Sequence, residues 1–307
     1  MARPEDREYE VIAHAKVNLC LDVSSEVVDG RHPVKTVMQT ISLHDRMHAL
    51  VVWDIHNPGV KIEMRNVHGL EEKPVPLEDN LIYRAIIGFQ ARIGRPLEDR
   101  ITVTVDKGIP PRSGLGGGSS DCAAAIAFMA QLYGYETDGP EAMDVARSLG
   151  SDIAFFLKGG CCTLEGYGDV FKERLDAPEM NIVLARPDEG SRTPEVYRTF
   201  DETDGDPEGI SWGDAHANLL SILRSGGDVT AVAPALHNSL ELAACVVEPK
   251  VAFALGRLAE QPGVIRAMVS GSGSCVFGVC ESPEAAQAAA DTLASKGLWT
   301  RACTTVG

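Results

Sequence analysis

The sequence contains few basic residues and no long apolar run. Lys and Arg number 28 against 44 Asp and Glu, which gives a formal net charge of −16. A nucleic-acid surface needs a basic stripe that neutralises phosphates, so we expect no nucleic-acid partner. No uncharged apolar segment reaches the length that spans a bilayer, and no basic leader precedes an apolar stretch. We therefore expect a cytoplasmic protein with no export signal and no membrane association.

The sequence also lacks close cysteine pairs and metal-ligand spacings. Its eight cysteines are scattered and form no C-x-x-C motif, and the eight histidines show no ligand spacing with them. We interpret the cysteines as reduced core thiols. The acidic stretch 201–208 lacks the defined spacing of a calcium loop and is interpreted as solvated. The sequence thus assigns no metal ligand.

Length and pattern predict an α+β protein of two domains, which we place at residues 1–174 and 175–307. A chain of 307 residues with 44% hydrophobic content can bury a full core. Alternation predicts one or two strands over 8–23 and further strands at 48–55, 60–64, 101–107 and 181–186. Helices are expected at 80–93, 122–132 and 141–149, with two or three more between 194 and 259. A hairpin around 271–273, a helix at 283–296 and a final strand near 299–305 complete the chain.

The most informative segment is residues 109–130, IPPRSGLGGGSSDCAAAIAFMA. Glycine accepts positive φ and lets the backbone approach a ligand closely. The helix that follows directs unpaired N–H groups and a partial positive charge at that loop, beside two serine hydroxyls. We interpret the loop as a phosphate cradle; the alternative is a glycine-rich surface loop with an ordinary helix cap. Because the net charge opposes anions, local cations and helix dipoles must collect phosphates here.

The loop differs from two common phosphate-binding motifs. A Walker A loop carries Lys before its final Ser or Thr, where this chain has glycine. A Rossmann turn places its glycines straight after a strand, whereas residues 108–112, with two prolines, intervene here. The G-L-G-G-G-S-S spacing after a proline instead resembles the loop of the GHMP kinases.

Three further segments resemble one branch of that family, the 4-diphosphocytidyl-2-C-methyl-D-erythritol kinases. They are AHAKVNLCLDV at 13–23, DGRHPVKTVMQTISLHD at 29–45 and GSDIAFFLKGGCCTLEGYGD at 150–169. VSGSGSCVF at 269–277 is similar to the last glycine motif of the family. The resemblance spans about residues 8–280 in the same order. It implies a two-domain GHMP kinase fold, with an N-terminal ribosomal-protein-S5-like domain, a C-terminal ferredoxin-like sandwich and the active site between them.

The resemblance also implies an activity and its ligands. The activity is transfer of a phosphoryl group from ATP, with Mg²⁺ expected alongside it, to the 2-hydroxyl of 4-diphosphocytidyl-2-C-methyl-D-erythritol. ATP would be bound by Pro110, Gly114, Leu115, Gly116, Gly117, Gly118, Ser119 and Ser120. The acceptor would be bound by Asn18, His32, Tyr197, Ser272 and Gly273.

Lys16 and Asp152 match the catalytic residues of the family. Asp152 precedes the apolar stretch IAFFL and suits a general base near the attacking hydroxyl; its alternative role is a helix cap. An unpaired Lys16 in an apolar strand would be costly, so we expect it to pair with Asp152 near the developing alkoxide. The alternative is a lysine that snorkels from an edge strand.

Asn18 lies two residues after Lys16 and should share its face of the strand. In the family, His32 would read the edge of cytosine and Tyr197 would stack on the base. Their alternatives are an exposed loop histidine and an ordinary helix-face tyrosine.

The chain departs from the family at three positions. Arg31 stands where the family usually has Tyr, Pro33 replaces an acidic residue, and Arg112 replaces a small residue. An arginine plane can still stack on the base, and Arg112 would contact ATP phosphates or lie in solvent. Two other functions stay open, a homoserine- or mevalonate-type GHMP kinase and a catalytically silent nucleotide sensor. The D-G-x-H segment disfavours the first, and the presence of both Lys16 and Asp152 disfavours the second.

Overall fold

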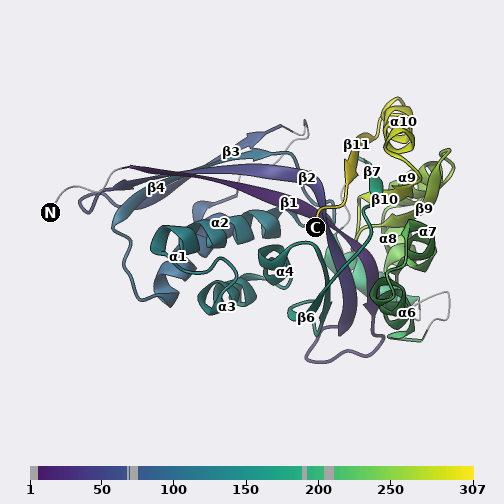
Figure 1. Ribbon diagram of the computed structural model, residues 1–307, viewed down its shortest axis with the longest axis horizontal. Coiled ribbons are helices and arrows are strands. Elements are labelled where there is room, and N and C mark those ends of the chain that lie inside the picture. Colours follow the sequence, from purple (N-terminus) through teal and green to yellow (C-terminus); the bar gives the residue numbers. More distant parts are fainter. Residues whose placement is uncertain (1–5, 68, 70–74, 189–191, 204–210) are drawn as a thin grey trace. The chain divides into compact units, whose positions relative to one another are not determined.

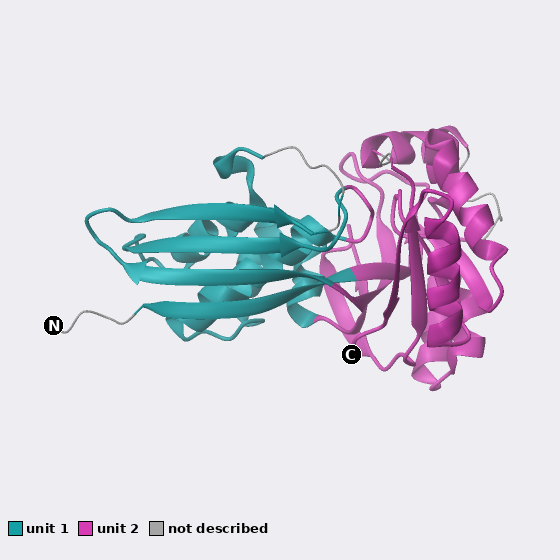
Figure 2. Ribbon diagram, turned by 90° about the horizontal axis from the view of Figure 1, so that it is seen from above, with its two compact units in different colours: residues 1–15, 44–111, 116–158 teal, residues 16–43, 112–115, 159–307 magenta. Residues whose placement is uncertain are grey.

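The computed structural model describes residues 6–67, 69, 75–188, 192–203 and 211–307. These residues form two compact units that interleave along the chain (Figure 2). Unit 1 comprises residues 1–15, 44–111 and 116–158, and unit 2 comprises 16–43, 112–115 and 159–307. The division of the chain into domains at residue 174 remains a prediction.

Two long strands run through both units (Figure 1). β1 spans Arg7–Val23 and confirms strand structure over 8–23, as a single strand. β2 spans Val34–Trp53, so the prediction that it begins at residue 48 is wrong by fourteen residues. Residues 36–41 are buried on both faces of the strand. Where both faces are buried, the alternation that reveals a strand in a sequence disappears.

In unit 1, helices cover one face of the sheet (Figure 1). Strand β3 (Gly59–Asn66) runs parallel to β4 (Asp99–Lys107), and β4 is antiparallel to β2. The helices are α1 (Leu81–Arg92), α2 (Gly117–Tyr133), α3 (Pro140–Leu149) and α4 (Ile153–Lys158), preceded by a short 3₁₀ turn, η1 (Leu77–Asp79). The predicted helix at 80–93 is confirmed, and Asn80 caps it by accepting a hydrogen bond from the Ile82 N–H.

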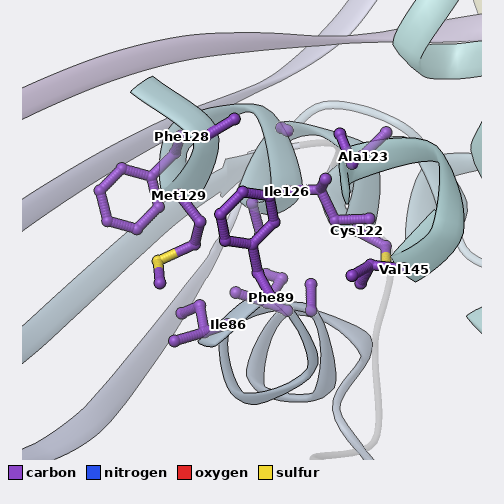
Figure 3. Packing of buried hydrophobic residues seen from close by; sticks show 14 of the residues in the cluster. Ile86, Phe89, Cys122, Ala123, Ile126, Phe128, Met129 and Val145 are labelled. Atoms are coloured by element: carbon purple, nitrogen blue, oxygen red, sulfur yellow. The ribbon is translucent and has the colours of Figure 1, made fainter. Parts of the chain in front are cut away.

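The core of unit 1 forms where α1 and α2 meet the sheet (Figure 3). Phe89 of α1 and Phe128 of α2 are fully buried. Small residues of α2, such as Cys122 and Ala123, lie beside Val145 of α3 in the same cluster. Close packing of α2 on both neighbouring helices fixes the helix whose first turn is the predicted phosphate cradle.

Unit 2 contains an antiparallel sheet in the order β11-β7-β10-β9. Its strands are β7 (Asn181–Arg186), β9 (Val264–Val269), β10 (Val276–Cys280) and β11 (Trp299–Thr304), and α10 (Pro283–Ala294) packs on it. The predicted hairpin, helix and final strand are thereby confirmed. Three strands that the sequence did not predict, β5 (Cys161–Glu165), β6 (Val170–Leu175) and β8 (His237–Asn238), join the sheet of β1 and β2.

The helical segment of unit 2 is more divided than expected. Instead of two or three helices between 194 and 259, its described part contains α5 (Thr193–Glu202), α6 (Asp214–Arg224), α7 (Val229–Val232), η2 (Ala233–Ala235), α8 (Glu241–Val247) and α9 (Pro249–Ala259). Pro234 and Pro249 lie in the first turns of η2 and α9, because proline fits the first turn of a helix and interrupts its interior. Among the described residues, no helix is both long and apolar enough to cross a bilayer. Most of the acidic stretch 201–208 lies outside the described residues.

Candidate active site

The second half of the glycine loop forms the first turn of α2, in unit 1. The helix begins at Gly117, five residues earlier than predicted, and Gly116 precedes it in the left-handed conformation with φ 76°. The first turn of any helix has N–H groups without an acceptor inside the helix. Gly117, Gly118 and Ser119 supply these groups, and a helix dipole lies behind them. Ser120 is buried, and its hydroxyl donates to the carbonyl oxygen of His14 over 2.6 Å.

A buried charge cluster that the sequence did not reveal lies against this turn. Lys107 donates to a carboxylate oxygen of Asp45 and, over 2.6 Å, to Asp121 Oδ2. The other oxygen of Asp45 accepts from the N–H groups of Gly108 and Ile109 at 2.7 and 2.8 Å. A Cβ atom at Gly117 would lie 3.6 Å from Lys107 Nζ. The cluster therefore ties the end of β4 to the first turn of α2.

Burial and charge shift the pKa values within this cluster. Burial raises the pKa of Asp121 to about 7, opposed by Lys107 and assisted by Asp45. Burial lowers the pKa of Lys107, but the two carboxylates outweigh it and raise the pKa overall. Asp121 Oδ1 is buried without a hydrogen-bond partner among the described residues. One ammonium thus faces two carboxylates, and protonation of Asp121 removes the excess negative charge.

The first half of the glycine loop lies in unit 2, beside β1. The N–H of Lys16 donates to the carbonyl oxygen of Leu115 over 3.0 Å, and the Leu115 side chain is fully buried. Gly114 has a φ of 74° and packs directly on the turn after β9. The side chain of Leu115 therefore anchors the loop, so any contact of this residue with ATP would come from its main chain. Pro110, in unit 1, is also buried.

Lys16 and Asn18 share one face of β1, as the spacing predicted. Lys16 Nζ donates to Asn18 Oδ1 over 2.6 Å, and both residues are at least 96% buried. Asn18 Nδ2 donates to Thr36 Oγ1 over 2.9 Å, and the Thr36 hydroxyl donates to the carbonyl oxygen of Cys20. This hydrogen-bond chain fixes the amide orientation of Asn18, so that its oxygen faces the ammonium.

The glycine turn after β9 lies against the same two side chains. A Cβ atom at Gly271 would lie 3.5 Å from both Lys16 Nζ and Asn18 Oδ1. Asn238 holds this turn by donating to the carbonyl oxygens of Val269 and Gly271 at 2.9 and 2.8 Å. Asn238 is not among the residues predicted from the sequence. An asparagine at the end of a two-residue strand carries no local signal of this role.

The predicted cytosine-binding side chains also lie in unit 2, and they contact one another. The His32 ring stacks on Tyr197 with a centroid distance of 5.5 Å and an interplanar angle of 27°. His32 Nδ1 lies 2.9 Å from the carbonyl oxygen of Ser24, and Nε2 lies 3.2 Å from Asp201 Oδ1. The guanidinium of Arg31 lies over a different ring, that of Tyr167, at 3.8 Å. The structure thus brings His32 and Tyr197 together, while Arg31 stacks elsewhere.

A cavity of about 510 Å³ opens beside Gly114. Both predicted substrate residues of the glycine turn line it, and the Ser272 hydroxyl lies 2.8 Å from that of Thr193. The full lining comprises Arg112, Gly114, Arg192, Thr193, Pro194, Ser272 and Gly273. The cavity combines two guanidinium groups, hydroxyls and the N-terminus of α5, a set of groups that suits an anionic ligand.

Asp152 lies in unit 1, immediately before α4. It is half-buried, and Ser151 Oγ donates to its Oδ1 over 3.3 Å. Its carbonyl oxygen accepts from the Phe156 N–H. Because Lys16 belongs to the other unit, the pairing of Lys16 with Asp152 remains a prediction. The assignment of every site residue to ATP or acceptor likewise remains a prediction.

Sequence comparisons relate the chain to proteins of one kind. The models of the GHMP kinases N-terminal and C-terminal domains match residues 80–160 and 216–297. A 4-diphosphocytidyl-2-C-methyl-D-erythritol kinase of Desulfitobacterium hafniense is 35% identical, over 91% of this chain and 90% of the relative. One of Nocardioides is 36% identical, over 93% of both chains.

Comparison with solved structures points to the same kind of protein. A crystal structure of 4-(cytidine 5'-diphospho)-2C-methyl-D-erythritol kinase is similar with a TM-score of 0.75 at 31% identity, covering 97% of this chain and all of that one. These matches confirm the predicted α+β GHMP kinase fold. The chain belongs to the GHMP kinase family and, within it, to the 4-diphosphocytidyl-2-C-methyl-D-erythritol kinases.

Proposed function

We propose that the protein transfers a phosphoryl group from ATP to the 2-hydroxyl of 4-diphosphocytidyl-2-C-methyl-D-erythritol, in the non-mevalonate synthesis of isoprenoid precursors. The observation that carries the proposal is the buried Lys16 ammonium, aligned by Asn18 and Thr36 beside Gly271. A buried cation with a fixed direction suits a site where negative charge develops. The names of the relatives support the identity of the acceptor.

The chemistry divides between four groups of this chain. Asp152 accepts the proton of the 2-hydroxyl as its oxygen attacks phosphorus, and the bond from phosphorus to the ADP oxygen breaks. Lys16 stabilises the alkoxide that develops at the attacking oxygen. The first turn of α2 binds ATP phosphates through its N–H groups and dipole. His32 and Tyr197 hold the cytosine, the first at the edge of the base and the second at its face.

Mg²⁺ is expected to enter with ATP and to neutralise its phosphates. Protein sites for Mg²⁺ in kinases use one or two carboxylates together with phosphate oxygens and water. Among the described residues there is no group of three or more His, Cys, Asp or Glu side chains that could hold a metal ion. The cytoplasmic location and the absence of a nucleic-acid partner remain predictions from composition.

A coupled assay of ADP release tests the proposal against its rivals. The purified protein is given ATP with 4-diphosphocytidyl-2-C-methyl-D-erythritol, homoserine or mevalonate, each alone. We expect turnover with the cytidylylated acceptor only. Turnover with homoserine or mevalonate alone would favour another GHMP kinase, and nucleotide binding without turnover of any acceptor would favour a sensor.

A further inference from the structure

The cavity beside Gly114 carries positive charge in a strongly acidic protein. Arg112 and Arg192 both line it, although the chain has a formal net charge of −16. The carbonyl oxygen of Arg112 accepts from the N–H and, over 3.4 Å, from the hydroxyl of Ser274. Arg112 is thereby fixed to the glycine turn. Local cations of this kind are what an anionic ligand requires when the overall field of the protein opposes it.

A third arginine increases the local positive charge. Arg186 ends β7 and is 96% buried. Its Nη1 donates to the carbonyl oxygen of Pro187 over 3.0 Å, while its Nε has no hydrogen-bond partner among the described residues. Burial lowers the pKa of Arg186; the neighbouring Asp188 carboxylate opposes this shift, and the Arg112 guanidinium adds to it. Arg186 does not line the cavity, but its charge adds to that of Arg112 nearby.

Arg192 approaches the cavity from the N-terminus of α5. It is the residue before the helix, and the helix of ten residues begins with Thr193 and Pro194. Arg192 Nη1 lies 3.3 Å from Glu195 Oε1, with the arginine side chain 73% exposed. Exposed ion pairs of this kind contribute little stability, so the guanidinium is available to a phosphate. The Thr193 and Ser272 hydroxyls add two further groups able to donate.

The side chain of the predicted cytosine-binding histidine is buried and engaged at both ring nitrogen atoms, whereas Arg192 pairs with Glu195 at the surface. Both nitrogen atoms of His32 face protein oxygens, those of Ser24 and Asp201. Arg31, which stands where the family usually has Tyr, lies on the ring of Tyr167, so we expect one face of the base to lack an aromatic partner. We therefore expect this chain to bind the base with one stacking contact fewer than its relatives make. The cavity, in contrast, offers two cations to phosphates.

We propose that Arg112 and Arg192 bind the diphosphate of the acceptor and that the number of phosphates, more than the base, determines acceptor affinity. The proposal rests on the proposed function, because it assigns the cavity to the acceptor and not to ATP. Charge-assisted hydrogen bonds to phosphate are the strongest contacts available to a guanidinium, and two arginines match two phosphates.

Calorimetric titration with cytidine, CMP and CDP tests the proposal directly. For the natural protein we expect affinity to rise at least tenfold from cytidine to CDP. Arg112→Gln and Arg192→Gln should each lower CDP affinity by about ten- to a hundredfold, with cytidine affinity unchanged. Arg198→Gln is the matched control, because Arg198 is an exposed arginine of the same helix that does not line the cavity. Equal CDP affinity in the natural protein and both variants would overturn the proposal.

A second set of titrations tests whether the arginines bind the phosphates of the acceptor or those of ATP. The same variants are titrated with a non-hydrolysable ATP analogue, for which we expect changes below about twofold. If the analogue loses affinity and CDP does not, the arginines serve ATP and the proposal is wrong. If CDP binds through the arginines but the natural protein phosphorylates no cytidylylated acceptor, the cavity assignment stands and the proposed function fails.

Discussion

Gly114 lies so close to Ser270 that a Cβ atom at position 114 would be 2.1 Å from the Ser270 carbonyl oxygen. The same glycine has a φ of 74°, a conformation that side chains with a Cβ disfavour. Ser270 Oγ in turn donates to the carbonyl oxygen of Gly114 over 3.2 Å. The loop before α2 and the turn after β9, 156 residues apart in the chain, thus pack backbone to backbone.

This contact predicts unequal effects at two glycines of the loop. Gly114→Ala should lower the free energy of unfolding by more than about 2 kcal/mol, because it adds both a clash and backbone strain. Gly118→Ala is the control, since the nearest atom to its Cβ would be Leu81 Cδ1 at 3.9 Å. Chemical denaturation should show Gly118→Ala within about 1 kcal/mol of the natural protein. Equal stability of the two variants would contradict the close packing.

Asp152→Asn should separate chemistry from binding. The change preserves size but removes the basic group, so kcat should fall by roughly two to four orders of magnitude with little change in ATP affinity. Asp138→Asn is the control, because Asp138 lies in the same unit and pairs with Lys158 at the surface. A near-native kcat in Asp152→Asn would reject it as the base.

Lys16→Met should also lower kcat. If Lys16 and Asp152 act as a unit, the double variant loses less than the product of the two single effects. Steady-state kinetics of the two single variants and the double variant measures this coupling. Independent effects that multiply would argue against the predicted pair.

Thr36→Val should change the orientation of the Lys16 ammonium without a substitution at Lys16 itself. Thr36 accepts a hydrogen bond from Asn18, and the loss leaves a buried amide unsatisfied, at a cost of about 1–3 kcal/mol in stability. Asn18 then no longer orients the ammonium, so kcat should fall together with stability. Thr36→Ser retains the hydroxyl and should restore kcat. If Thr36→Ser and Thr36→Val have the same kcat, the hydrogen-bond chain does not position Lys16.

Tyr197→Ala should raise KM for the cytidylylated acceptor. Stacking on a base contributes about 1–3 kcal/mol, similar in the ground and transition states, so kcat should change little. Tyr197→Phe keeps the ring and serves as the control. An unchanged KM in Tyr197→Ala would reject the predicted cytosine contact.

Asp121→Asn should alter the pH dependence of stability. Burial raises the pKa of Asp121 to about 7, against a value near 3.9 in the unfolded chain. Between these two pKa values Asp121 binds more protons in the folded state than in the unfolded state. This group therefore makes the natural protein less stable as pH rises from about 4 to 7. Denaturation at several pH values should show the variant gaining relative stability over that range. A constant difference would mean that Asp121 does not titrate there.

The sequence alone determined the features that depend on short stretches of chain. The glycine cluster at 114–118 marked the loop, Asn80 marked the start of α1, and alternation marked β4. The order of four motifs was sufficient to indicate the family. These signals are local, because φ preferences, helix capping and strand alternation act over a few residues.

Only the tertiary structure decided which distant groups meet. Lys107 joins Asp45, 62 residues away, and Asp121, 14 residues away, in one buried cluster. Asn238 holds the carbonyl of Gly271 across 33 residues. Such pairings depend on how strands and helices pack, and burial then sets their energies, so no local pattern encodes them. The sequence therefore determined the glycine loop, which we predict to bind phosphate, while the fold determined the charges and hydrogen bonds that hold it in place.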